Sequence, residues 1–191
     1  DLHLSIRRQR QMCIRDRVIW SKGESVAKAV NKAIIPGIQG GPHNNQTAAI
    51  DLMFEYMQKA SFKKYAEQIV KNAKALVTEL KKYEFNLVSD GTENHLFLID
   101  LKNKNISGLE CENLLEQAGI IANRNTIPGD LKPFHPSGIR IGTPSVTSRG
   151  LREKEMKILA HCIHGLIDLK TDPKIIHREI ILLCKKFPLP Y

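Results

Sequence analysis

The stretch SGIRIGTPSVTSRG, at residues 137–150, decides the fold of this 191-residue chain. Ile139, Arg140 and Ile141 alternate in character, which predicts a β-strand because successive side chains of a strand point to opposite faces. A guanidinium on the inward face of that strand would need an anionic partner, and its planar fork suits a carboxylate. The alternative is an outward-facing arginine on an edge strand. The pattern by itself favours neither arrangement.

The segments on both sides of this stretch predict further strands and helices. Apolar runs typical of strands are FNLVSD (85–90), HLFLIDL (95–101) and IIANRN (120–125), and a proline-rich loop, TIPGDLKPFHPSG, occupies residues 126–138. Helices are expected at about 46–83, 107–117, within 152–169 and at 173–186. This mixture of strands and helices indicates an α/β or α+β fold.

Capping residues mark the expected helix starts. Ser107 with Glu110 three residues later fits a capping box, in which each residue satisfies a free backbone N–H of the other. Asp172 is followed by proline, which is the usual order of an N-cap and the first helical position. Thr147 or Ser148 is expected to cap the helix within 152–169.

Gly40 and Gly41 lie in the loop PGIQGGPH (36–43), just before a predicted helix. Two adjacent glycines let backbone N–H groups approach an anion, and the dipole of the following helix favours negative charge there. A phosphate site is one interpretation, and a simple turn between two helices is the other. No GK[ST] follows, so the loop is not a Walker motif.

Composition and charge limit the possible classes of protein. Hydrophobic residues make up 42% of the chain and charged residues 26%, which excludes wholesale disorder and a collagen-like or coiled-coil composition. No apolar run has the length of about 20 residues that a membrane-spanning helix needs. The net charge of +9 permits a basic nucleic-acid-binding module, but no RNP, KH or zinc-finger pattern accompanies it.

The cysteines and histidines do not form a readable metal or redox motif. Four widely spaced cysteines, with no CxxC pair, favour reduced thiols in a cytoplasmic protein. His161 and His164 would share a helix face, but a metal site would want more ligands at matched spacing. We therefore expect no metal site, no nucleic-acid partner and no membrane contact.

Six segments together resemble serine hydroxymethyltransferase: PGIQGGPH (36–43), KNAKAL (71–76), LVSDGTENHLFLIDL (87–101), NRNTIPGD (123–130), SGIRIGTPSVTSRG (137–150) and IILLCKKFPLPY (180–191). They occur in the family's order with near-family spacing, over residues 18–191. The family consists of fold-type I enzymes that use pyridoxal 5'-phosphate. They interconvert serine and glycine and pass the one-carbon unit to tetrahydrofolate.

The resemblance implies an α/β fold that forms the C-terminal part of the aspartate-aminotransferase-like transferase fold. Residues 18–85 would be the end of the large cofactor-binding domain and a connecting helix, and residues 86–191 a small C-terminal α/β domain. Arg140 matches the arginine that holds the amino-acid carboxylate. Gly40 and Gly41 match the glycines that reach the cofactor phosphate of the neighbouring subunit, which implies a homodimer or tetramer. The folate-binding loop is matched by Asn125, Lys132, Pro133 and Phe134.

Residues 1–17, DLHLSIRRQRQMCIRDR, depart from the family. A THKTLRGPRGG-like stretch precedes the VIW position in the family, and its Schiff-base lysine would fall at Gln9, which has no amine that can form an imine. We interpret residues 1–17 as a non-native junction and expect the chain to be inactive by itself. The alternatives are a fragment of another fold-type I enzyme such as an aminotransferase, and a natural short protein with a regulatory role.

Overall fold

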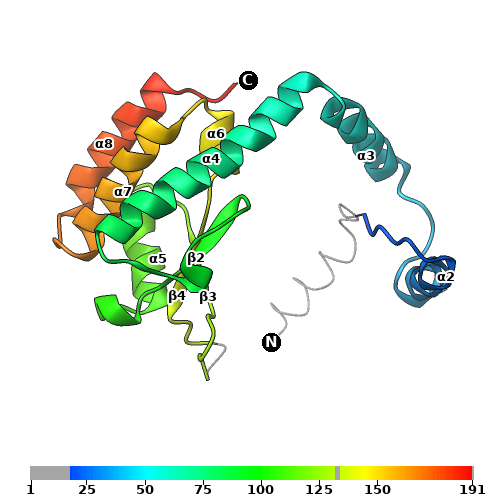
Figure 1. Cartoon of the computed structure of the whole chain (residues 1–191), viewed down its shortest axis with the longest axis horizontal. Helices are drawn as coiled ribbons and strands as arrows, with labels where there is room; N and C mark the ends of the chain where they lie inside the picture. Colours follow the sequence, from blue (N-terminus) through cyan, green and yellow to red (C-terminus); the bar gives the residue numbers. More distant parts are fainter. Residues whose placement is uncertain (1–17, 132–133, 191) are drawn as a thin grey trace. The chain divides into compact units, whose positions relative to one another are not determined.

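A computed structural model describes residues 18–131 and 134–190 of the chain. The chain divides into two compact units, and the boundary lies between Phe62 and Lys63. Unit 1 is described here over residues 18–62, and unit 2 begins at residue 63. Figure 1 labels the helices and strands of both. No helix of the described residues combines the length and the apolar character needed to cross a bilayer.

Unit 1 consists of helices with no buried residue. It contains α2 (Glu24–Lys32), an irregular helical turn η1 (Ala33–Ile38) and α3 (Asn44–Met57). No side chain within residues 18–62 is classed as buried. The ring of Trp20 lies edge-on to that of Phe54, with 6.0 Å between the centroids. Residues 18–20, VIW, have no regular secondary structure.

The long helix expected over residues 46–83 is two helices. The first, α3, ends at Met57, and the second, α4, runs from Ala60 to Lys82. No glycine or proline occurs between residues 44 and 82, so no residue type that breaks helices marks the interruption. Only α4 buries a face, formed by Asn72, Ala73, Leu76, Val77 and Leu80. Because this face belongs to unit 2, α4 packs with the C-terminal residues.

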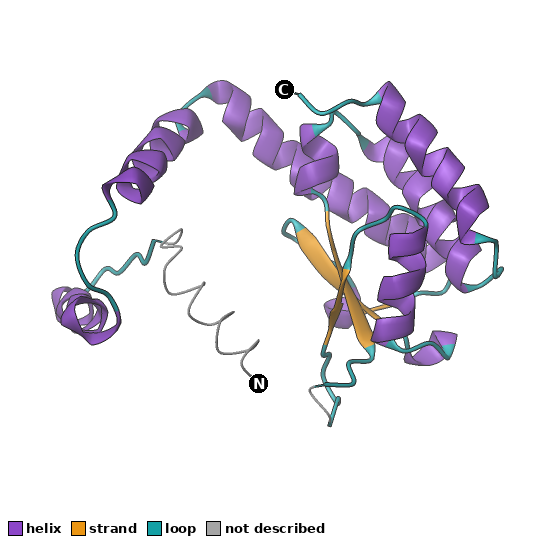
Figure 2. Cartoon of the chain, turned by 180° about the vertical axis from the view of Figure 1, so that it is seen from behind, coloured by secondary structure: helices purple, strands orange, loops and turns teal. Residues whose placement is uncertain are grey.

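The sheet of unit 2 is antiparallel throughout, with the order β1-β2-β4-β3. Its strands are β1 (Asn86–Leu87), β2 (Leu96–Asp100), β3 (Asn123–Asn125) and β4 (Gly138–Gly142). The strands predicted at 95–101 and around Ile139 are confirmed, whereas β1 and β3 are shorter than expected. Figure 2 shows the strands, in orange, beside the helices of unit 2.

One face of this sheet forms the core together with the helices. Phe97, Ile99, Ile139 and Ile141 alternate along β2 and β4 and are all buried. They belong to one apolar cluster with residues of α4, α5 (Gly108–Gln117), α7 (Glu153–Ile167) and α8 (Pro173–Lys186). The apolar face of each of these helices thus points toward the sheet. The mixture of helices and sheet confirms the α/β class.

Two of the three predicted helix starts are confirmed. Ser107 and Glu110 form the reciprocal capping box, and the side chain of Asp172 accepts a hydrogen bond from the backbone N–H of Lys174 at 2.8 Å. The third prediction was wrong. Residues 144–148 form a separate short helix, α6 (Pro144–Ser148), and α7 starts after Arg152. Gly150 separates them with a φ of +91°, a conformation that glycine adopts readily.

Candidate functional site

Arg140 lies at the centre of β4 on the face of the sheet that the core does not cover. Its side chain is exposed, while its neighbours Ile139 and Ile141 are buried on the opposite face. The residues opposite it are Leu98 on β2 and Asn123 on β3. The outward direction agrees with one alternative derived from the sequence. That alternative was wrong about the strand, because β4 lies between two strands and is not at an edge.

The backbone of β4 is held at both ends, which fixes where Arg140 lies. At its start, a Cβ on Gly138 would come within 2.9 Å of the carbonyl oxygen of Asn125, so this close approach requires glycine. At its end, the hydroxyl of Thr143 donates to the carbonyl of Ile69 on α4 at 2.9 Å. Contacts to a neighbouring strand and to α4 therefore position the central arginine.

Asn125 lies on the strand next to Arg140. It ends β3, and its register partner is Gly138 at the start of β4. Asn123 and Asn125 are two residues apart on one strand, so both share the face of Arg140. The side-chain amide of Asn125 donates to the carbonyl of Thr126 at 2.8 Å, at the base of the loop that follows. Two residues predicted from the resemblance, Arg140 and Asn125, are thus brought to adjacent strands.

Asp130 closes the loop between Asn125 and β4, and sequence analysis assigned it no role. Its carboxylate accepts hydrogen bonds from the backbone N–H groups of Ser137, at 2.9 Å, and Ile127, at 3.1 Å. The Ser137 N–H is the main cause that lowers the pKa of Asp130 to about 2, with the Ile127 N–H and the Lys102 ammonium adding to it. The only sequence signal was the position of this aspartate in a Pro-Gly-Asp turn.

The other residues predicted for the folate site are less constrained. Phe134 is 82% exposed, so its ring is accessible in unit 2. Lys132 and Pro133 lie outside the described residues. The structure therefore places Asn125 at the start of this loop and Phe134 within it, and the predictions for Lys132 and Pro133 stay predictions.

Gly40 and Gly41 lie in unit 1, three to four residues before the start of α3 at Asn44. Both are exposed, and a Cβ added to either would meet no heavy atom within 4 Å beyond the adjacent residues. Steric crowding by the described residues therefore does not explain the pair. A pair of glycines beside the N-terminus of a 14-residue helix fits a phosphate group, because N–H groups and the helix dipole both attract anions.

The two histidines and the cysteine of α7 lie in different surroundings. The Nδ1 atom of His164 lies 2.7 Å from the carboxylate of Asp168, and its ring stacks on Tyr83. His161 is exposed, and the buried thiol of Cys162 lies 3.6 Å from Glu179. Within residues 18–131 and 134–190, no three potential metal-ligating side chains gather. Burial raises the pKa of Cys162 to about 12, so this thiol is not reactive at neutral pH.

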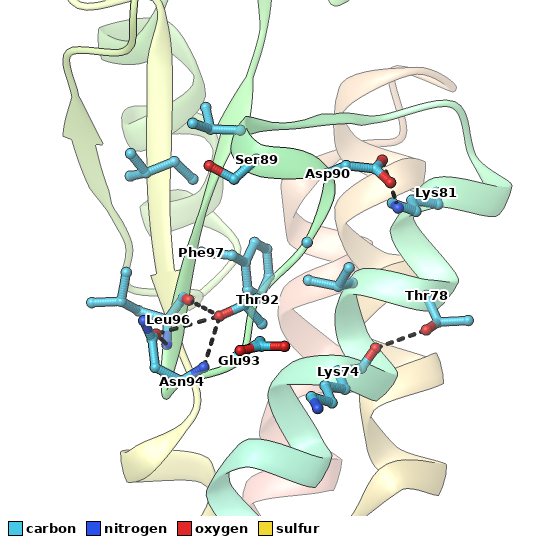
Figure 3. A pocket seen from close by; sticks show the side chains of 14 residues that line it. Lys74, Thr78, Lys81, Ser89, Asp90, Thr92, Glu93, Asn94, Leu96 and Phe97 are labelled. Carbon is cyan, nitrogen blue, oxygen red and sulfur yellow. Dashed lines mark hydrogen bonds and ion pairs between the residues drawn. The ribbon is translucent and has the colours of Figure 1, made fainter.

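A groove of about 730 Å³ runs between α4 and β2, beside the loop at residues 88–94. Figure 3 shows Lys74, Lys81 and Asp90 on its walls, with the ammonium of Lys81 2.7 Å from the carboxylate of Asp90. Leu98, the β2 neighbour of Arg140, also lines it. Ser89 and Asp90 adopt the positive φ values of a tight turn at the end of the run 85–90 that was expected to form a strand.

Comparison with known proteins gives the family. Residues 5–163 match the family model described as serine hydroxymethyltransferase, and this range begins within residues 1–17. The serine hydroxymethyltransferase of Desulfotalea psychrophila (strain LSv54 / DSM 12343) is 47% identical over 180 residues, which cover 92% of this chain and 42% of the relative. The chain thus spans about 42% of the length of this curated relative. The match favours neither an aminotransferase nor a nucleic-acid-binding module, and this chain belongs to the serine hydroxymethyltransferase family.

Proposed function

We propose that this chain forms the C-terminal part of a cytoplasmic enzyme that interconverts serine and glycine and transfers the one-carbon unit to tetrahydrofolate. The observation that carries the proposal is Arg140, an exposed guanidinium on an interior strand with an amide as its hydrogen-bonding partner. Its remaining N–H groups suit the carboxylate of an amino acid, because a guanidinium binds a carboxylate through two parallel hydrogen bonds. Such a clamp orients the bonds at Cα, and positioning of this kind contributes to rate.

The cofactor of this proposal is pyridoxal 5'-phosphate, which supplies the electron sink for bond cleavage at Cα when it is bound. Gly40 and Gly41 would hold its phosphate through backbone N–H groups, aided by the N-terminus of α3. We assign this phosphate to the site of a neighbouring subunit. The active enzyme would then be a homodimer or a tetramer.

Tetrahydrofolate would bind along the loop between β3 and β4. Asn125 can offer both an amide donor and a carbonyl acceptor to a planar heterocycle. The exposed ring of Phe134 provides an apolar surface near the other end of the loop. Lys132 and Pro133 would complete this contact. The one-carbon acceptor would thus lie next to the strand that carries Arg140.

Two preparations test this function. The first is the 191-residue chain, which we expect to form no glycine from serine, tetrahydrofolate and pyridoxal 5'-phosphate, because Gln9 stands where the Schiff-base lysine is expected. The second is a chimera in which residues 18–191 replace the matching segment of the Desulfotalea psychrophila enzyme. We expect the chimera to form glycine. Turnover by the first preparation would contradict our interpretation of Gln9, and a folded but inactive chimera would contradict the proposed function.

A further inference from the structure

Two arginines on neighbouring strands, on opposite faces of the sheet, differ in the groups that lie against them. Arg124 on β3 is neutralised, because its Nη1 lies 2.8 Å from the carboxylate of Glu112 on α5. The same carboxylate also accepts the backbone N–H of Arg124 at 3.1 Å. Arg140 on β4 faces no carboxylate at ion-pair distance among the described residues. Its Nη2 donates instead to Oδ1 of Asn123, at 3.4 Å.

Asn123 is suited to hold the guanidinium of Arg140 without neutralising its positive charge. It is the direct register partner of Arg140, so the two side chains project from neighbouring strands on the same face. A carbonyl oxygen of an amide accepts one N–H and carries no net charge. Arginine has five N–H donors, so the others stay available to a ligand. A carboxylate at position 123 would instead pair with the guanidinium and compete with an anionic ligand.

We propose that Asn123 is a positioning residue for Arg140, which keeps the guanidinium oriented and cationic for the carboxylate of the amino-acid substrate. This inference rests on the proposed function of Arg140. Sequence analysis assigned no role to Asn123, because the pairing of residues 123 and 140 depends on the register of β3 against β4. The consequence is specific: changing Asn123 should weaken amino-acid binding and leave the folate site nearly unchanged.

The orientation itself can be measured in the 191-residue chain, without enzymatic activity. The Nε–Hε group of Arg140 is observed by 15N NMR relaxation in the parent chain and in Asn123→Ala, with Asn113→Ala, an exposed position on α5, as the matched control. We expect Asn123→Ala to lower the order parameter of this group and Asn113→Ala to leave it unchanged. An equal order parameter in all three proteins would overturn the inference whatever the chimera does.

The kinetic consequence is measured in the active chimera. Asn123→Ala should raise KM for serine by about three- to tenfold, the range expected for one hydrogen bond, with kcat within about twofold and KM for tetrahydrofolate unchanged. Asn123→Asp should raise KM for serine by a further tenfold or so, because the new carboxylate pairs with Arg140. A merely structural role would lower kcat and affect both substrates alike, and that result would overturn the inference. Inactivity of the parent chimera would count against the proposed function instead.

Discussion

Units 1 and 2 contain helices of the same length that differ in what they bury. Helices α3 and α8 each have 14 residues, yet α8 buries Ile176 and Ile180 while α3 buries none. Exposed large apolar side chains of unit 1 are Val18, Ile19, Trp20, Val26, Ile35, Ile38, Leu52, Met53, Tyr56 and Met57. Helices of this length are marginal in water without tertiary packing. Unit 2 thus contains its own core, whereas the apolar side chains of unit 1 need another surface to cover them.

Separating the two units is the most severe test of this comparison. Residues 63–191 should fold alone, with helical circular dichroism and one cooperative urea transition, because their core lies within the fragment. Residues 18–62 should show little helix, because they bury no side chain. Both fragments are measured at matched concentrations. A cooperative transition in residues 18–62 would contradict the claim that only unit 2 folds by itself.

Truncating an apolar side chain should lower the free energy of unfolding much more in unit 2 than in unit 1. Ile99→Ala removes a side chain that is 0% exposed, so we expect a loss of about 2–5 kcal/mol in the free energy of unfolding. Leu52→Ala in unit 1, at a position 67% exposed, should change it by less than about 0.5 kcal/mol. Urea denaturation of the 191-residue chain compares the two variants. Equal losses would show that Leu52 is packed in solution.

Asn72 tests whether α4 belongs energetically to unit 2. Its buried amide donates to the hydroxyl of Thr147 and to the carbonyl of Leu151, both at 2.9 Å, and it accepts from Gln68. Asn72→Ala removes a donor from the carbonyl of Leu151 and one hydrogen bond each from Thr147 and Gln68, and we expect a loss of about 1–3 kcal/mol in the free energy of unfolding. Asn113→Ala is the exposed control. An unchanged urea midpoint in Asn72→Ala would show that α4 does not depend on this contact.

Asp130 gives the smallest effect, and it depends on pH. Its pKa is about 2 in the folded chain against an ordinary 3.8, so its stabilising contribution is present above about pH 4. This contribution is lost as the pH falls through about 2, because the protonated group then resembles an amide. The stability difference between the parent and Asp130→Asn should therefore shrink between pH 4 and 2. A difference that stays constant over this window would contradict the role of Asp130 in closing the loop.

Local patterns in the sequence predicted the features that neighbouring residues determine. The capping box of Ser107 and Glu110 and the Asp172 cap involve residues only two or three positions apart, so their types suffice. The strands around Leu98 and Arg140 follow from alternation of side chains. The family was likewise evident from motifs, because functional residues such as Arg140 occur within short stretches of chain.

Only the tertiary structure decided which faces are covered and which residues meet. Periodicity continues across residues 58 and 59, so it could not reveal that α3 ends and α4 begins there. The exposed face of Arg140 and its contact with Asn123, 17 positions away, depend on the pairing between β3 and β4. A sequence pattern reports which residues share a face, but burial and register depend on the partner that lies against that face. This is the physical reason why Arg140 could be identified from the sequence, whereas its surroundings and Asn123 could not.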